Sequence, residues 1–160
     1  MTHEQYVQQY LGKRVDHDQM YWYQCVDLAR HYCSLVRWYA TKSFGGSAIT
    51  WRYNRSTTFA GKRYITWYPN DALDIKKGDI VIFKANVSVQ CKKPWDAQWK
   101  TVKLTQHWHV AVLHDYADND WVIRVVEQNG GTGNGSGVWS DAIRIYWYKG
   151  KDAIAGFILQ

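Results

Sequence analysis

Cys25 stands where a helix is expected to begin. Apolar and aromatic residues follow it at helical spacing and predict an amphipathic helix over residues 25 to about 39: Leu28, Ala29, Tyr32, Leu35, Val36 and Tyr39. The dipole and free N–H groups of a first helical turn favour a thiolate over a thiol. The same N–H groups, with the side chain of Gln24, could stabilise an oxyanion formed in acyl transfer. Cys25 is therefore a candidate nucleophile that needs a base.

His109 is the candidate base. It begins the run HVAVL, and Glu127 and Asn129 end the next such run, VVEQN. If the two runs pair as antiparallel strands through a turn at 117–120, the start of the first lies beside the end of the second. Alternation then places Glu127 and Asn129 on one face, where either can orient His109. A thiolate, an imidazole and a polar orienting group are the set that cysteine acyl transfer uses. The alternative is a histidine satisfied at a sheet edge.

Acidic residues surround the cysteine at the spacing of a calcium loop. With Asp16 as the first position, Asp18 is the third, Met20 the fifth, Trp22 the seventh and Asp27 the twelfth. The aspartates offer carboxylates, whereas Met20 and Trp22 can offer only backbone carbonyls. The loop departs from an EF-hand in lacking the turn glycine and the final Glu. A polar loop that leads into a helix is the alternative interpretation.

The remaining cysteines and histidines do not predict a zinc site. Cys25, Cys33 and Cys91 are an odd number without a C-x-x-C pair, so at least one thiol is free and a disulfide framework is not expected. Cys33 lies beside the apolar face of the predicted helix and is interpreted as packing. His107 and His109 could be a metal pair in one strand, but no third ligand follows at a familiar spacing.

Composition predicts one globular domain over residues 1–160. The chain has 10 Trp and 12 Tyr, rings that suit a core or a groove for polar ligands. Its net charge of +6 favours anionic partners such as nucleic acid, a membrane surface or an acidic cell wall. No nucleic-acid motif appears, no apolar run is long enough for membrane insertion, and the N-terminal residues lack the apolar core of a signal peptide.

The order of elements predicts an α+β fold. Thr2 and Gln5 resemble a capping box for a helix over 3–11 that Gly12 can end. Residues 41–75 are interpreted as loops and short helical pieces, and residues 84–107 as a long loop without periodicity. Five β-branched and aromatic runs predict an antiparallel sheet packed against the helices: 80–83, 109–116, 121–128, 143–148 and 154–159.

Four segments, in order, resemble the motifs of CHAP domains, the cysteine, histidine-dependent amidohydrolase/peptidases common in bacteriophage endolysins. They are YQCVDLARHY around Cys25, KGDIVIF at 77–83, HVAVL at 109–113 and VVEQNGG at 125–131. The resemblance spans nearly the whole chain. It implies a papain-like (NlpC/P60-like) α+β fold, in which N-terminal helices pack on an antiparallel sheet of about five to six strands.

The resemblance also implies roles for individual residues. Cys25 would be the nucleophile, His109 the general base, Glu127 the residue that orients the imidazole, and Asn129 a supporting residue. Gln24 and the backbone N–H of Cys25 would form the oxyanion hole.

Some phage CHAP domains bind calcium through a D-x-D segment before the cysteine and an Asp two residues after it. Asp16, Asp18 and Asp27 match that pattern, so a structural calcium ion is expected, with no organic cofactor.

The function so implied is peptidoglycan hydrolysis at an amide bond, by an endopeptidase or an N-acetylmuramoyl-L-alanine amidase. The expected partners are bacterial peptidoglycan and anionic wall polymers. The enzyme would be made in the host cytoplasm without its own signal peptide and act at the wall after release. Residues 84–107 depart from the family pattern and are expected near the substrate groove. The alternatives are a papain-like peptidase acting on proteins and a noncatalytic basic wall-binding domain.

Overall fold

The N-terminal helix forms where the capping residues predict it. The computed structural model describes residues 1–20, 24–37, 48, 64–65, 75–104, 107–117, 122–128 and 142–159. Helix α1 spans His3–Tyr10. The Thr2 hydroxyl accepts a hydrogen bond from the Gln5 N–H at 3.2 Å, and the Gln5 side chain accepts one from the Thr2 N–H at 2.8 Å. This reciprocal capping box pairs two N–H groups that the first helical turn leaves free.

Helix α2 begins at Cys25, as predicted, and spans Cys25–Tyr32. The expected α-helix to residue 39 is wrong in its last part, because a π-helical turn, η1, follows over Cys33–Arg37. This wider turn places the Arg37 guanidinium 5.7 Å from the centre of the Tyr32 ring. Residues 38 and 39 lie outside the described residues.

Gly78, the glycine of the KGDIVIF segment, lies against this turn. Its φ is +88°, a conformation that L side chains rarely adopt. A Cβ at this position would lie 2.5 Å from the Tyr32 hydroxyl and closer still to the Arg37 guanidinium. Only glycine therefore lets the start of the sheet approach the end of the helical segment this closely.

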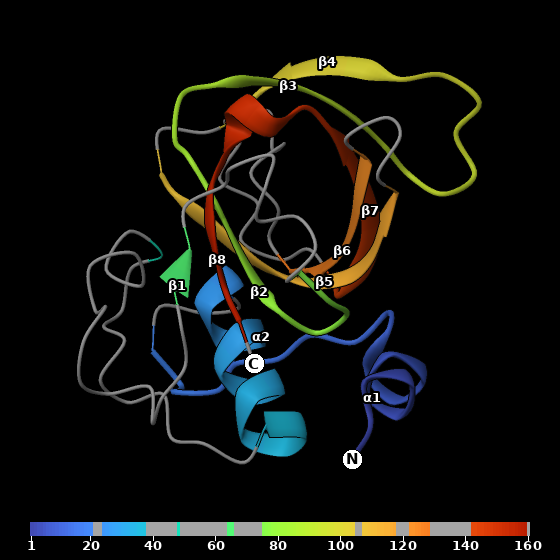
Figure 1. The fold of residues 1–160 in the computed structure, drawn as a ribbon. Helices are drawn as coiled ribbons and strands as arrows, with labels where there is room; N and C mark the ends of the chain where they lie inside the picture. Colours follow the sequence, from blue (N-terminus) through green and yellow to red (C-terminus); the bar gives the residue numbers. More distant parts are fainter. Residues whose placement is uncertain are drawn as a thin grey trace.

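The strands form one curved antiparallel sheet (Figure 1). Its order is β1-β8-β2-β5-β6-β7-β3-β4, which is eight strands rather than the expected five or six. The five predicted runs are β2, β5, β6, β7 and β8. The bounds are β1 Tyr64–Ile65, β2 Ile80–Phe83, β3 Ser88–Lys92, β4 Lys100–Lys103, β5 His109–Ala117, β6 Val122–Glu127, β7 Arg144–Lys149 and β8 Ile154–Ile158, with a short 3-10 turn, η5, at Lys151–Ala153.

The interpretation of residues 84–107 as a loop is wrong, because β3 and β4 pair there as a hairpin. In β3, Val89 and Cys91 are buried while Ser88 and Gln90 are exposed. This alternation is only five residues long, and β3 pairs with β7, which is distant in the sequence. A short strand with a polar outer face has too little periodicity to be recognised by itself.

Apolar side chains cover both faces of the sheet. On the outer face, Leu28 and Ala29 of α2 pack with Val110 and Val112 of β5, and Tyr6 of α1 joins the same cluster. Inside the curve, buried side chains of every strand from β2 to β8 except β4 form a second cluster. Cys33 is buried, as its interpretation as a packing residue requires. The N-terminal helices therefore pack on the sheet, and the α+β prediction is confirmed.

Two segments are described only in part. Of residues 41–75, only 48, 64–65 and 75 are described. The predicted turn residues 118–120 also lie outside the described residues. No described helix has both the length and the apolar character needed to span a bilayer.

Candidate active site

His109 and Glu127 meet at one end of the sheet. His109 is the first residue of β5 and Glu127 the last of β6, and antiparallel pairing of these strands brings the two ends together. The Nε2 atom of His109 lies 3.0 Å from Oε2 of Glu127. His109 is 3% exposed and Glu127 is fully buried. The predicted strand pairing and the predicted side-chain contact are both present.

Two side chains of β7 complete the surroundings of Glu127. The Arg144 Nε–H donates to Oε1 at 2.9 Å, and the Tyr148 hydroxyl donates to Oε2 at 2.8 Å. Burial raises the pKa of Glu127, but the hydrogen bond of His109, the charges of Arg144 and His109, and the Tyr148 hydroxyl lower it by more. The carboxylate therefore stays ionised although it is buried.

Arg144 and Tyr148 were not identified from the sequence. The segment IRIYWY does place them four residues apart on one face of a strand. The missing information was the register that sets Glu127 opposite Arg144.

Cys25 is the first residue of α2, and its interaction with His109 raises the pKa of that histidine. Burial lowers the pKa of His109, but the hydrogen bonds and charges of Cys25 and Glu127 raise it by more, so the net shift is upward. The Nε2 atom of His109 is hydrogen-bonded to Glu127. Its Nδ1 atom has no fully formed hydrogen bond with any described residue. Nδ1 is therefore the ring atom available to take a proton from the thiol. Contacts of this kind are often loose before substrate binds.

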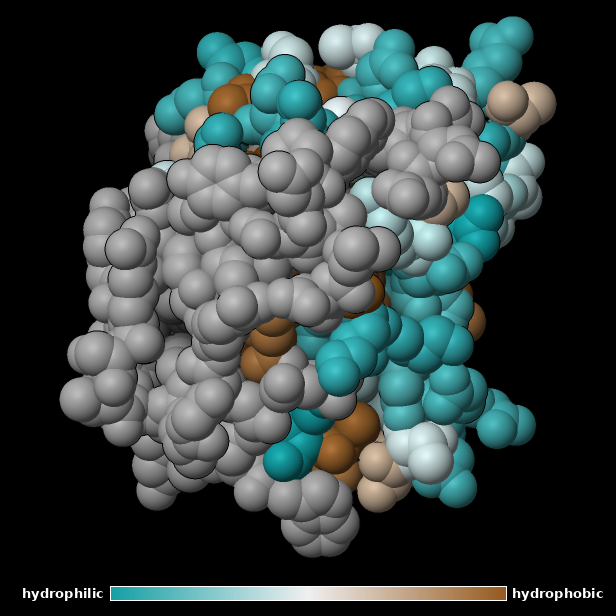
Figure 2. Space-filling view, viewed as in Figure 1, coloured by the Kyte–Doolittle hydropathy of each residue, from teal (hydrophilic) through white to brown (hydrophobic). Residues whose placement is uncertain are grey.

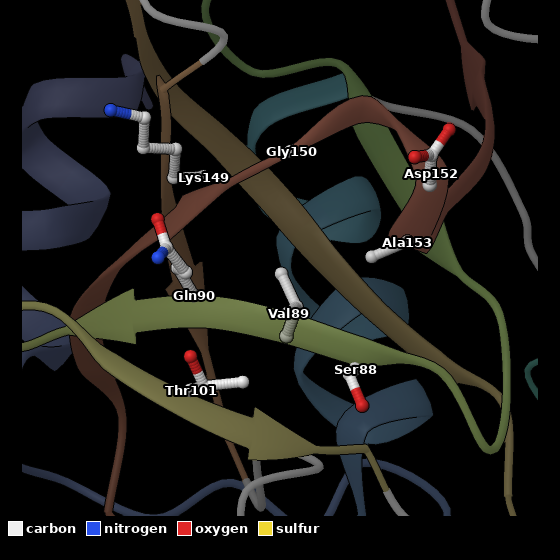
Figure 3. Close-up of a pocket in the computed structure, with 8 residues that line it drawn as sticks. All are labelled: Ser88, Val89, Gln90, Thr101, Lys149, Gly150, Asp152 and Ala153. Carbon is white, nitrogen blue, oxygen red and sulfur yellow. The ribbon is translucent and has the colours of Figure 1, made fainter.

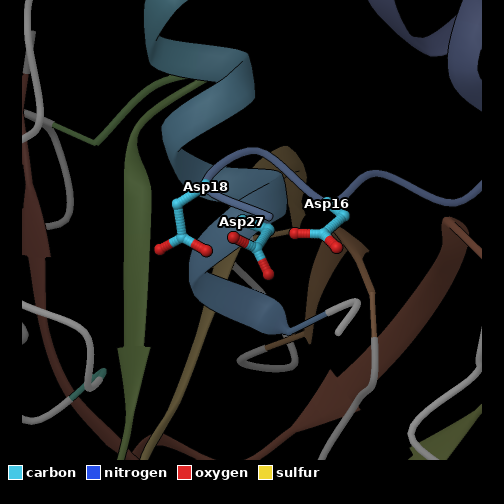
Figure 4. Close-up of side chains that lie close together, drawn as sticks. All are labelled: Asp16, Asp18 and Asp27. Atoms are coloured by element: carbon cyan, nitrogen blue, oxygen red, sulfur yellow. The ribbon is translucent and has the colours of Figure 1, made fainter. Parts of the chain in front are cut away.

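Asp16, Asp18 and Asp27 gather beside the start of α2 (Figure 4). One carboxylate oxygen from each lies within 4.8 Å of the others. Oδ2 of Asp27 accepts the Gln24 N–H at 2.8 Å and caps the helix. Oδ1 of Asp27 and Oδ1 of Asp16 are buried without a hydrogen-bond partner among the described residues. These two oxygens are the orphaned polar atoms that a bound cation would satisfy.

The charges in this aspartate cluster are only partly compensated. Burial raises the pKa of Asp27 to about 6, and the charges of Asp18 and Asp16 act in the same direction against the backbone hydrogen bonds that lower it. Arg30 supplies a counter-charge through its salt bridge with Asp18. Hard oxygen donors around unbalanced negative charge fit Ca²⁺.

The other predicted ligands and supporting residues are less well defined. Met20 is exposed, and its backbone N–H donates to Oδ1 of Asp18 at 2.9 Å. Trp22 and Asn129 lie outside the described residues, so their roles stay predictions. Gln24 is the N-cap of α2 and is half-buried, and its predicted oxyanion contact also stays a prediction. Among the described residues, no third ligand joins His107 and His109.

Gln128 is a further structural residue that the sequence analysis missed. It is fully buried next to Glu127. Its side chain accepts the Val15 N–H at 2.7 Å and donates to the carbonyls of Val15 at 2.7 Å and Gln24 at 3.1 Å. One amide thus holds both ends of the aspartate loop, at the residue after Glu127. No local pattern marks a single glutamine for such a role.

Comparison with known proteins shows a similarity in fold. No protein-family model matches the chain, and no curated protein matches it. A solved structure described as the crystal structure of a wild-type endolysin, LysIME-EF1, superposes with a TM-score of 0.65 at 21% sequence identity. The alignment covers 99% of this chain but 64% of the endolysin chain, so this chain spans less than two thirds of that protein. At this identity the similarity shows the fold.

Proposed function

We propose that this chain is a cysteine-dependent peptidoglycan hydrolase with the papain-like fold of CHAP domains. The observation that supports this most directly is the buried His109–Glu127 pair beside Cys25 at a helix N-terminus. A nucleophile, a base and an ionised orienting group are the minimum set for acyl transfer through a thioester. The similarity in fold to an endolysin and the CHAP-like motifs favour peptidoglycan as the substrate.

The first half of the reaction forms an acyl-enzyme. Nδ1 of His109 takes the thiol proton, and Sγ of Cys25 attacks the amide carbonyl carbon of the wall peptide. The backbone N–H of Cys25 and the Gln24 side chain stabilise the oxyanion. The C–N bond then breaks, and the imidazolium gives its proton to the leaving amine.

The second half releases the product. His109 removes a proton from water, the hydroxide attacks the thioester carbonyl, and the C–S bond breaks as Sγ leaves and regains its proton. Glu127 stays ionised throughout and holds the imidazole by its Nε2 atom, held in turn by Arg144 and Tyr148. The bond that is cut is either within a stem or bridge peptide or between N-acetylmuramic acid and L-alanine.

A calcium ion would be held by the carboxylates of Asp16, Asp18 and Asp27, with the backbone carbonyls of Met20 and Trp22 as further ligands. When bound, it would supply positive charge that stabilises the loop before Cys25. Asp27→Asn keeps an oxygen for the Gln24 N–H but removes the charge. We expect calcium to raise the melting temperature of the natural protein relative to a chelator, and to lose this effect in Asp27→Asn.

The control for this calcium experiment is Asp152→Asn, at an exposed aspartate outside the cluster. That variant should keep the full response to calcium. An unchanged melting temperature of the natural protein, with calcium and with chelator, would show that the aspartates do not form a metal site.

The test of the proposed function is Cys25→Ala in a turbidity assay on Gram-positive cells and purified walls. We expect lysis to be lost while the far-ultraviolet circular dichroism spectrum is unchanged. Cys91→Ala, which removes a buried thiol from the inner cluster, is the control and should retain lysis. Mass spectrometry of the digested wall then identifies the bond. Lysis by Cys25→Ala would refute the mechanism, and cleavage of an unfolded protein instead of wall would favour a papain-like peptidase.

A further inference from the structure

The outer face of the sheet changes character beyond the helices. Near α2 it carries apolar residues, such as the paired Val126 and Ile145. Two residues further along the same strands, Arg124 pairs with Trp147, and Trp147 pairs with Lys92 of β3. Side chains two residues apart lie on one face of a strand. We name the continuing surface the basic face: Arg124, Trp147, Lys149, Gln90, Lys92, Trp99, Thr101 and Lys103.

Cations and indole rings alternate across this face. The Arg124 guanidinium lies 4.5 Å from the centre of the Trp147 ring. The Lys92 amine lies 4.8 Å from Trp147 and 5.2 Å from Trp99. Residues from β6, β7, β3 and the loop before β4 therefore form one continuous stack. Such contacts hold long side chains in place, so less conformational entropy is lost when a ligand binds.

The basic face has an excess of positive charge. Arg124 is paired with Asp115, and both side chains are partly exposed. Within the described part of the chain, Lys92, Lys103 and Lys149 take part in no ion pair. In Figure 2 the upper part of the molecule, over β3 and β4, is mostly hydrophilic. A surface with this charge favours a polyanion as its binding partner.

A hollow adjoins the stack (Figure 3). Its volume is about 340 Å³, and hydroxyl, amide, amine and carboxylate groups lie around it, from Ser88, Thr101, Gln90, Lys149 and Asp152. Gln90 lies between Lys149 and Thr101, as the strand register requires. These groups can donate to and accept from hydroxyl groups as well as bind phosphate.

The tip of the β3–β4 hairpin extends the same chemistry away from the sheet (Figure 1). Trp95 is 76% exposed, the highest value among the exposed large hydrophobic side chains described. The Lys93 amine lies 5.6 Å from the centre of its ring. An exposed indole beside a lysine can stack on a polyol or sugar while the amine binds its phosphate.

Protection of a sheet edge explains only part of this surface. Lysines on an edge strand prevent pairing with other chains, which accounts for Lys100 and Lys103 of β4. It does not account for Trp147 and Lys92, because β7 and β3 are paired on both sides. A binding role explains the presence of both Trp147 and Lys92 on strands that are not at the edge of the sheet.

We propose that the basic face binds an anionic, hydroxyl-rich phosphate polymer of the bacterial wall. Lysines bind its phosphates, the hollow takes its hydroxyl groups, and the indole rings stack on its carbon chain. Trp147 is three residues from Arg144 along β7, about 10 Å at the rise of a strand, and points to the opposite face. A polymer bound there is therefore separated by the sheet from Arg144 and Glu127. The proposal deepens the proposed function by naming a second wall component, and its binding test does not depend on catalysis.

Binding is measured with the full chain carrying Cys25→Ala, so that the wall is not digested. Co-sedimentation compares purified walls with the same walls stripped of phosphate polymer by hydrofluoric acid. We expect Lys92→Gln/Lys103→Gln/Lys149→Gln to weaken binding to complete walls about tenfold at moderate salt, since three charge contacts are lost. Stripping should reduce binding of the parent protein by a similar factor.

The matched control is Lys13→Gln/Lys76→Gln/Lys77→Gln, which removes the same charge from outside the basic face and should change binding less than about twofold. Trp95→Ala, at an exposed site that cannot disturb the core, should also weaken binding. The proposal would be overturned if both triple-lysine variants lost the same amount of wall binding. It would also be overturned if the parent protein bound complete and stripped walls equally. Competition by double-stranded DNA at lower concentration than by poly(glycerol phosphate) would overturn it as well, because the occupant would then be nucleic acid.

The binding proposal and the proposed function can fail independently. If the charge-dependent binding is found but natural protein releases no peptide fragments from walls, the basic face stands and the hydrolase proposal fails. If fragments are released but the two triple-lysine variants bind walls equally, the hydrolase proposal stands and the binding role of the basic face fails.

Discussion

Glu127 makes three charge-assisted contacts at a fully buried position. Its two oxygens contact His109, Arg144 and Tyr148, from β5 and β7. Because the pKa of this carboxyl is lowered and that of His109 is raised, the proton of the pair resides on the imidazole. Glu127 therefore keeps its charge and favours the protonated form of His109.

Glu127→Gln tests this assignment. The amide has nearly the same shape but no charge, so the pKa of His109 should fall. Lysis requires His109 in its protonated form for departure of the amine, so its alkaline limb should move to lower pH. We expect the rate to drop on the order of a hundredfold. The pKa of His109 is read from the ¹⁵N chemical shift of its ring.

Glu4→Gln, at an exposed glutamate of α1, is the control for the loss of one negative charge. A His109 titration unchanged by Glu127→Gln would show that the carboxylate does not set the charge of the imidazole.

At the level of elements, local patterns predicted what is close in sequence. The start of α2 and the strands β5 and β6 follow from long apolar runs, and the short link between those strands correctly placed His109 beside Glu127. Arg144 was missed because the register of β7 on β6 is not a local property. The β3–β4 hairpin was missed because its partner β7 is distant in sequence and its outer face is polar.

Helix α1 is held to the rest of the fold by a buried histidine. Nδ1 of His3 lies 2.9 Å from the Tyr32 hydroxyl of α2, and Nε2 lies 2.9 Å from Nδ1 of His114 in β5. One nitrogen of each imidazole pair must donate and the other accept, so the contact between the rings is lost if both are protonated. Burial and, after it, the charge of His114 together lower the pKa of His3 to about 4.

This network predicts acid lability. The unfolded chain binds a proton at His3 near its ordinary pKa, whereas the folded chain does so only near 4. The stability contributed by neutral His3 is therefore complete above pH about 6.5 and is lost as the pH falls towards 4. We expect the melting temperature of His3→Gln to fall less over this range than that of the natural protein, by about 5 °C.

Hydrogen exchange of the amides of α1 identifies where the acid-induced opening occurs. His107→Gln, at an exposed histidine, should leave the pH dependence unchanged. Parallel melting curves for His3→Gln and the natural protein would exclude His3 as the acid-sensitive contact.

Gln128 links the aspartate loop to the end of β6, so its loss should affect both. Gln128→Ala leaves the polar backbone groups of Val15 and the carbonyl of Gln24 without this partner. We expect the free energy of unfolding to fall by about 1–3 kcal/mol, measured in urea. Affinity for calcium, measured by calorimetry, should weaken with it. Gln98→Ala, at an exposed residue, is the control, and equal effects of the two substitutions would contradict the role of Gln128.

At the scale of the whole molecule, the residues of the proposed catalytic set come together where a helix meets the sheet. Cys25 belongs to α2, and His109 and Glu127 belong to β5 and β6, which α2 covers. At pH 6.5 an ordinary thiol is mostly protonated and reacts slowly. We expect iodoacetamide to modify Cys25 at least about tenfold faster in the folded protein than in urea, although Cys25 is half-buried in the folded protein.

Peptide mass mapping separates this reaction from those of the buried Cys33 and Cys91, which should show the opposite order. A thiol at Cys25 that reacts faster in urea would show that the fold shields it without activating it.

The docking of α2 on β5 also affects the order of events during synthesis. The ribosome makes Cys25 long before it makes His109 and Glu127, so the residues of the proposed catalytic set cannot meet early in synthesis. They meet only when the sheet has formed beneath α2. Under the proposed function, an unfinished or misfolded copy could not hydrolyse amides, and completion of the fold would itself be the activation step.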